Sequence, residues 1–106
     1  MTFITLIPMA DNDGIRFPHA VIDEIIEDLI SAFGGVTVLG RVRGAWVDSE
    51  DGRVYRDVST RVMVVCDDND LEKARKAVVE IGRKLRQIEM YFEVRLGGDV
   101  EMIRVD

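Results

Sequence analysis

The stretch FGGVTVLGRVRGAW, residues 33–46, marks the change from a helical to a strand pattern along the chain. Gly34-Gly35 supplies the left-handed backbone conformation with which helices commonly end. The residues after it alternate with a period of two, which indicates a β-strand. Residues with even and odd numbers therefore point to opposite faces of this strand, and we call this the parity of a residue. The even-numbered face holds Val36, Val38, Gly40, Val42, Gly44 and Trp46, and the odd-numbered face holds Thr37, Leu39, Arg41, Arg43 and Val47.

The patterns on either side of this stretch predict the remaining elements. Upstream, an apolar run predicts a strand over residues 2–9, and apolar residues at helical spacing after Pro18 predict a helix. Downstream, the Asp51-Gly52 turn predicts a hairpin to a second alternating strand over residues 53–66. Further along, the spacing of apolar residues predicts a helix over residues 69–88 and a strand over residues 90–96. A GGD turn at residues 97–99 then leads to a last strand over residues 100–105.

This order of elements is β-α-β-β-α-β with a short C-terminal hairpin, and it predicts an α+β fold of the ferredoxin-like sandwich type. Right-handed crossover connections place both helices on one face of an antiparallel sheet. With 106 residues and no linker, we expect a single domain over residues 1–106. Two layers leave the second face of the sheet without a cover, and we call it the open face.

The composition argues against several classes of function. A net charge of −6 disfavours nucleic acid and anionic membrane surfaces, because binding to either depends on positive charge. The N-terminal run is too short for a membrane span and has no basic lead, so we expect a cytoplasmic protein. The single cysteine, Cys66, lies on the helix-facing parity of its strand, which predicts a buried structural residue.

The acidic clusters DNDG, DSEDG and DDND do not suggest a metal site. The first two lack the ligand spacing of a calcium loop, and all three are interpreted as turns and helix caps. The sequence contains no Cys/His cluster, phosphate-binding loop, dinucleotide glycine pattern or catalytic triad. We therefore expect no metal and no cofactor, and the question of enzymatic activity stays open, with a preference for a non-enzymatic role.

The open face carries the candidate binding residues. It combines tyrosine, methionine and arginine, the residue types that are enriched in protein interfaces. Three interpretations remain: a homodimer packed sheet to sheet, a hydrated face with cross-strand ion pairs, and a platform for a small molecule or a single-stranded nucleic acid. The residues expected to bind an anionic small molecule there are Arg41, Arg43, Tyr55, Asp57, Arg61 and Tyr91.

A second candidate site lies at the start of the first predicted helix. Phe17 has no side-chain oxygen to cap the free N–H groups there, so Arg16 and His19 are candidates to hold a carboxylate or a phosphate. Water or Asp13 would satisfy the same groups without a ligand. Trp46 shares the helix-facing parity, which predicts a packing residue under a helix rather than a residue that stacks on a ligand.

The segments GGVTV, GAW and DGRVYRDVS resemble the middle strands of a bacterial family of small ferredoxin-like proteins of unknown function. The family pattern is GGxTV, then GxW, then (D/E)xS before an aliphatic strand. The likeness extends over residues 18–96, and its matching positions are Gly35, Thr37, Val38, Gly44, Trp46, Gly52, Asp57 and Ser59. The resemblance implies a ferredoxin-like fold and brings no activity with it.

Together these patterns predict a homodimeric binding or interaction module that uses its open face. The alternative is a small dimeric α+β-barrel-type enzyme, or a regulatory module, that binds an anionic small molecule on the face lined by arginine and tyrosine. A fold of this kind hosts many functions and does not choose between them.

Overall fold

The computed structural model describes residues 1–97 and 100–105. Its strands form a single four-stranded sheet in the order β2-β3-β1-β4, and every neighbouring pair is antiparallel. The α+β class predicted from the sequence is confirmed. The elements are β1 (Thr2–Pro8), α1 (His19–Phe33), β2 (Thr37–Val47), β3 (Val54–Val65), the short 3₁₀ helix η1 (Asp68–Asp70), α2 (Leu71–Lys84) and β4 (Phe92–Arg95).

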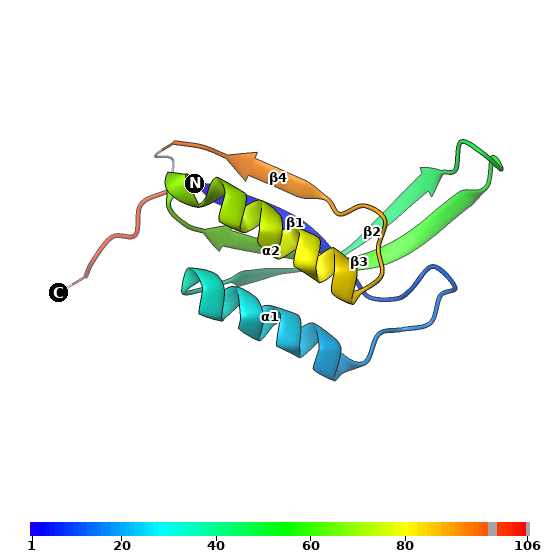
Figure 1. The fold of residues 1–106 in the computed structure, drawn as a ribbon, viewed down its shortest axis with the longest axis horizontal. Coiled ribbons are helices and arrows are strands. Elements are labelled where there is room, and N and C mark those ends of the chain that lie inside the picture. Colours follow the sequence, from blue (N-terminus) through cyan, green and yellow to red (C-terminus); the bar gives the residue numbers. More distant parts are fainter. Residues whose placement is uncertain (98–99, 106) are drawn as a thin grey trace.

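Both helices lie side by side over the same face of the sheet (Figure 1). The core between these two layers comes from alternate residues of the central strands and from one stripe of each helix. Val62 and Val64 are completely buried on the helix side of β3, as the parity of that strand predicts. The core is completed by Phe3, Ile7, Ile22, Ile25, Leu29, Ala74, Val78, Ile81 and Leu85.

The end of α1 follows the prediction from Gly34-Gly35. Gly34 adopts a φ of 85°, and its N–H donates to the carbonyl of Ile30 at 2.7 Å. A residue with a side chain would be strained in this conformation, whereas glycine adopts it freely. The chain therefore leaves the helix at Gly34 and enters β2 three residues later.

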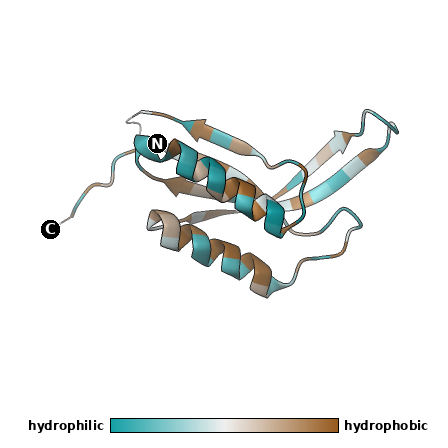
Figure 2. Cartoon of the chain, viewed as in Figure 1, coloured by the Kyte–Doolittle hydropathy of each residue, from teal (hydrophilic) through white to brown (hydrophobic). Residues whose placement is uncertain are grey.

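The long strands β2 and β3 extend as a two-stranded ribbon beyond the helices (Figure 1). We call this ribbon, residues 41–58 with its turn, the arm. It carries several exposed apolar side chains, which also show as brown segments along the ribbon in Figure 2. The arm and the C-terminal segment make the molecule elongated, with extents of 54 × 29 × 22 Å and a radius of gyration of 15.1 Å.

A β-bulge in β2 reverses which of its residues face the helices. The register with β3 shifts between Val38 and Gly40, and Gly40 has a φ of 112°. One extra residue moves every later side chain to the other face of the strand. Trp46 therefore pairs with Tyr55 on the open face, and the prediction that it packs under a helix is wrong.

The same shift corrects the expected positions of two arginines. Arg41 pairs with Thr60 and Arg43 pairs with Val58, and both partners belong to the helix-facing parity of β3. Both arginines are exposed because the arm projects beyond the helices. Their prediction as open-face residues is wrong.

The C-terminal strand expected over residues 100–105 is not formed, and the turn expected before it falls partly on residues 98–99, outside the described residues. Residues 100–105 leave the body of the molecule without regular structure (Figure 1). Their apolar side chains are strongly exposed: Met102 by 83%, Ile103 by 76% and Val105 by 90%. Within the described part of the chain, neither helix has the length and apolar character required to cross a membrane.

Candidate functional site

The open face is apolar at its centre and charged around it. Cross-strand pairs between β1 and β3 place Ile4 beside Met63 and Leu6 beside Arg61. These side chains are only half-buried, because no helix lies over this face. The charged residues of the open face carry both signs; they are Asp57, Arg61, Glu93 and Arg95.

One polar cluster occupies the β4 side of the open face. The Tyr91 hydroxyl donates to Glu93 Oε1 at 2.7 Å, and the Tyr91 carbonyl accepts from Thr5 Oγ1 at 2.7 Å. The hydrogen bond to Glu93 raises the pKa of Tyr91, and the nearby Arg61 charge opposes this rise. The structure thus brings Arg61 and Tyr91 together, with Glu93 as a partner that sequence reasoning had not singled out.

A second cluster occupies the tip of the arm. The Trp46 and Tyr55 rings stack with their centroids 4.7 Å apart, and the Arg53 guanidinium lies 5.1 Å from the centre of the Tyr55 ring. The Tyr55 hydroxyl donates to Asp51 Oδ2 at 3.0 Å. This hydrogen bond is the main reason that the pKa of Tyr55 is raised. The cluster leaves Trp46 51% exposed, so it presents an aromatic surface to solvent.

The six residues predicted to bind a ligand therefore do not form one site. Tyr55 and Asp57 lie on the arm, whereas Arg61 and Tyr91 lie over the central and β4 strands. Arg41 and Arg43 of β2 face the opposite side of the sheet. Asp57 lies over Gly44, where a Cβ atom would come within 2.5 Å of its Oδ1. The arrangement gives an extended mixed surface instead of a pocket.

The signal that could have placed Trp46 is the glycine at position 40. A glycine inside a strand pattern often marks a bulge, and a bulge here shifts the alternation of all later residues. The alternation alone places Gly40 and Gly44 on the same face of the strand. Nothing in the local pattern shows which of the two glycines bears the bulge.

At the start of α1, Arg16 and His19 are both exposed, and no side chain caps the helix. Arg16 forms an isolated β-bridge with Ala10. The nearby Asp11 carboxylate accepts the N–H groups of Asp13 and Ile15, each at 2.9 Å, so it caps the preceding turn and not the helix. Anion binding at this helix start stays a prediction.

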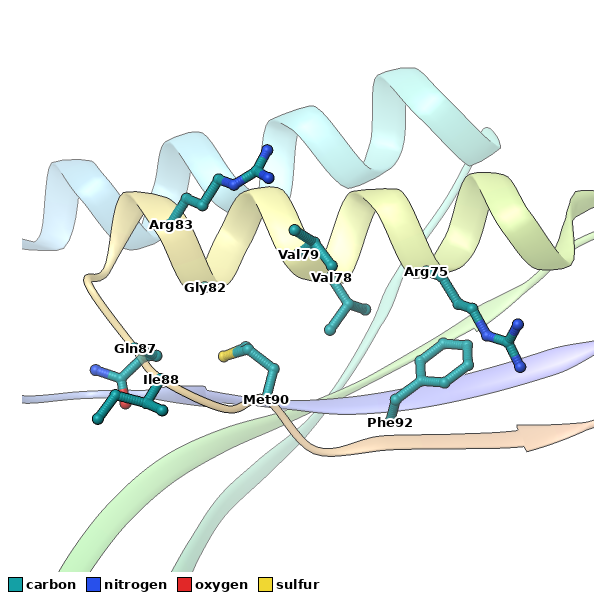
Figure 3. A pocket seen from close by; sticks show the side chains of 9 residues that line it. All are labelled: Arg75, Val78, Val79, Gly82, Arg83, Gln87, Ile88, Met90 and Phe92. Carbon is teal, nitrogen blue, oxygen red and sulfur yellow. The ribbon is translucent and has the colours of Figure 1, made fainter.

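A separate groove lies between α2 and the segment that leads into β4 (Figure 3). Its volume is about 430 Å³. Gly82 allows a close approach here, because a Cβ atom at that position would come within 2.8 Å of Met90 Cγ. The residues that line the groove are Arg75, Val78, Val79, Gly82, Arg83, Gln87, Ile88, Met90 and Phe92.

Neither metal nor thiol chemistry stands out in the described residues. Within residues 1–97 and 100–105, no group of three His, Cys, Asp or Glu side chains is arranged to hold a metal ion. Cys66 is half-buried, and this burial is the main cause of a raised pKa of its thiol. A thiol with a raised pKa is a weak nucleophile at neutral pH.

No family model and no curated protein matches the chain. Among solved structures, it is similar to a phage SAM lyase in complex with S-methyl-5′-thioadenosine, with a TM-score of 0.61 and 10% identity over 89% of this chain and 88% of that one. It is also similar to a Bacillus cereus protein related to NIF3, with a TM-score of 0.62 and 14% identity. That match covers 87% of this chain but only 24% of the NIF3-related protein.

A DUF3240 family protein from Shewanella baltica OS155 is also similar, with a TM-score of 0.45 and 13% identity over 94% of each chain. At such identities, the first two likenesses show a shared fold and nothing of the chemistry.

Proposed function

We propose that this protein is a homo-oligomeric interaction module in which the open face and the arm pack against a second copy of the chain. The observation that carries the proposal is the amount of exposed surface. The molecule exposes 7761 Å², whereas a compact monomer of its mass exposes about 6,000 Å². Its radius of gyration of 15.1 Å also exceeds the value of about 13 Å expected for a compact chain of this length.

The extra exposed area is comparable with what a stable interface needs. Standard protein interfaces bury roughly 800 Å² on each partner. Part of the excess comes from residues 100–105, and the rest includes the arm, where four large apolar side chains are 40% to 63% exposed. An isolated two-stranded ribbon is marginally stable in water, so packing against a partner would stabilise it. The four are Trp46, which lies on the open face, and Val47, Val54 and Val58, which lie on the opposite face of the arm.

The charge pattern of the open face also supports a second copy as the partner. Arg61 and Arg95 share this face with Asp57 and Glu93. In a symmetric pair each positive side chain can meet a negative one from the other copy, because the same surface serves on both sides. A face of one sign would oppose such self-association.

The proposal also includes the fold type, the family likeness, the location and the dimeric state of the protein. The strand order β2-β3-β1-β4 with two helices on one face supports a ferredoxin-like sandwich. The resemblance to the bacterial family of unknown function, the cytoplasmic location and the dimeric state also remain part of the proposal. The alternative of an anionic small molecule on the open face is less supported, because Arg41 and Arg43 lie on the other side of β2.

The direct test is the mass of the protein in solution, measured by gel filtration with light scattering at micromolar concentration. We expect an oligomer for the wild-type chain and a monomer for Met63→Asp, which places a charge at the apolar centre of the open face. Ile30→Asp is the matched control, since Ile30 is an exposed apolar residue of α1, away from the sheet residues of the open face. Should Met63→Asp fail to fold by circular dichroism, Trp46→Ala replaces it. A wild-type chain that is monomeric throughout this range contradicts the proposal.

A further inference from the structure

The groove beside α2 adjoins a free strand edge. β4 is the last strand of the sheet on this side, so its outer edge has no partner strand among the described residues. The groove is lined mainly by apolar side chains, and Ile88 at its border is 94% exposed. Figure 3 shows Phe92, Met90 and Val78 directed into this space, with the Arg75 and Arg83 side chains near its ends. An open edge next to an apolar groove is a typical receptor for an extended segment that adds as a strand.

We infer that this groove binds residues 100–105 of the same chain, which add to the outer edge of β4 as a fifth strand. These residues include apolar side chains that are 76% to 90% exposed, namely Met102, Ile103 and Val105. They follow β4 after only four residues in the sequence. Docking would remove two apolar surfaces from water at once, which is favourable in proportion to the area that is buried.

The turn that this docking requires begins in the described structure. Gly97 has a φ of 102°, and a positive φ at the first central position is typical of the two-residue turns that join antiparallel strands. The sequence at this point is Gly97-Gly98. The Gly97 N–H donates to Asp68 Oδ2 at 3.2 Å, so it is bound to the start of η1 and is not needed for the strand ladder.

The shortest hairpin that could start at Gly97 has two residues in its turn, and we take its register for the added strand. It places Ile103 opposite Phe92 and Val105 opposite Met90, on the side that faces the groove. Phe92 and Met90 are both half-buried groove residues. The aliphatic side chains of the segment would thus meet the apolar lining of the groove.

The charges of the segment and the groove agree with this pairing. The same register puts Glu101 opposite Val94, two residues beyond Phe92 toward the start of α2. Arg75 lies at that end of the groove (Figure 3). The present partner of Arg75 is Glu72, at 2.8 Å, in an exposed i,i+3 pair. Such pairs contribute little to stability, so Arg75 can turn to Glu101 at small cost.

The same chain is a better source of this segment than a second copy. A short linker gives a tethered segment an effective concentration in the millimolar range, which exceeds ordinary protein concentrations. The groove lies on the helix side of the sheet, away from the open face. Docking of residues 100–105 fills the groove without covering the open face, so docking and self-association can each fail without the other.

The test is hydrogen exchange of residues 92–95 and 100–105 in the full chain, compared with Ile103→Asp. In the wild-type chain, we expect the amide hydrogens of both segments to exchange at least about tenfold more slowly than those of an unstructured peptide. Ile103→Asp should abolish the protection of residues 100–105, and in β4 it should affect only the N–H groups that β1 does not bind, without changing exchange in β3. Met102→Lys, on the opposite side of the added strand and opposite Glu93, is the matched control and should retain the protection. Exchange of residues 100–105 at the rate of unstructured peptide overturns the inference, and so does protection that disappears on dilution.

Disulfide trapping separates the same chain from a second copy. In a Cys66→Ser background, Glu93→Cys with Met102→Cys places the two thiols directly opposite each other in the inferred register. We expect a disulfide within one chain, seen as a monomer on a non-reducing gel. The pair Glu93→Cys with Ile103→Cys should form little of it, because the two side chains lie on opposite faces. Glu93→Cys alone is the control, because Glu93 also lies on the open face and its thiol could link two copies there. Disulfide-linked dimers that form from the first pair but not from Glu93→Cys alone would overturn the inference and make the occupant a second copy.

Discussion

The indole ring of Trp46 stacks on the phenol ring of Tyr55 at the tip of the arm, with an interplanar angle of 18° and 4.7 Å between ring centroids. At this point β3 pairs only with β2, because its pairing with β1 begins at Ser59. A stacked aromatic pair contributes about 0.5–1.5 kcal/mol beyond its buried area, so it helps to hold the two strands of the arm together. The exposed side of Trp46 stays available to a partner.

Replacing Trp46 should therefore affect association more than folding. We expect Trp46→Ala to weaken self-association by roughly 2 kcal/mol or more, the loss typical of a central aromatic interface residue. The free energy of unfolding of the monomer should fall by only about 1 kcal/mol, because the side chain is half exposed. Sedimentation equilibrium measures the first quantity and urea denaturation at low protein concentration measures the second.

Trp46→Phe serves as the control, since it keeps an aromatic ring over Tyr55. It should retain most of the association of the wild-type chain. If Trp46→Ala associates as tightly as the wild type while remaining folded, the arm tip is not part of the interface.

Strict alternation predicts the faces of β3 correctly but fails in β2, where the bulge at Gly40 interrupts it. In β3, alternation without interruption placed Val62 and Val64 on the helix face, where they are completely buried. In β2, the same alternation held only as far as Val38, because one extra residue at the bulge inverted the rest of the strand. Local sequence patterns report periodicity, whereas a bulge depends on how two strands pair over a distance.

Gly40 should be intolerant of any side chain. Its φ of 112° lies in a region that other residues rarely adopt, although a Cβ atom added there would meet no other atom within 4 Å. Gly40→Ala should thus cost about 1–3 kcal/mol through backbone strain alone. Gly35→Ala is the matched control: that position is equally open and has no positive φ, so its cost should stay within about 0.5 kcal/mol. Urea denaturation of the two variants compares these free energies, and equal stabilities would contradict the strain at the bulge.

The two tyrosines should ionise only at high pH. Hydrogen bonds to Asp51 and Glu93 raise the pKa of Tyr55 and Tyr91, respectively, above the usual value of 10.0. Because each folded-state pKa is raised, the stabilisation from the neutral phenol is complete below pH 10.0 and is lost as the pH rises through the folded-state value. Ultraviolet absorbance of tyrosinate measures both titrations.

Asp51→Asn should lower the pKa of Tyr55 toward its ordinary value and leave that of Tyr91 unchanged. The amide oxygen can still accept the Arg53 N–H, which donates to Asp51 Oδ1 at 2.8 Å in the present turn. The variant thus removes a charge while keeping the turn. A titration of Tyr55 that is identical in both proteins would show that the hydrogen bond does not persist in solution.

The helices and the core stripe were accessible from the sequence because each depends on the spacing of apolar residues. The closeness of Arg61 to Tyr91 was not, because it depends on the register of the strands across β1. The strand predicted over residues 100–105 shows a third limit. An alternating apolar segment indicates that a strand is possible, but a strand also needs a partner edge.

Cys66 should react slowly with thiol reagents in the folded protein. Burial is the largest cause of its raised pKa, and the negative charge of Asp70 raises it further. Only the thiolate is nucleophilic, so at pH 8 we expect labelling by a disulfide reagent several-fold slower than that of a free cysteine. The rate should increase with pH beyond 9 and become that of an ordinary thiol in urea. Asp70→Asn should accelerate the reaction, whereas Asp48→Asn, on the distant turn of the arm, should not. A folded-state rate equal to the rate in urea would mean that the end of β3 opens freely and that Cys66 is not held in the packed structure.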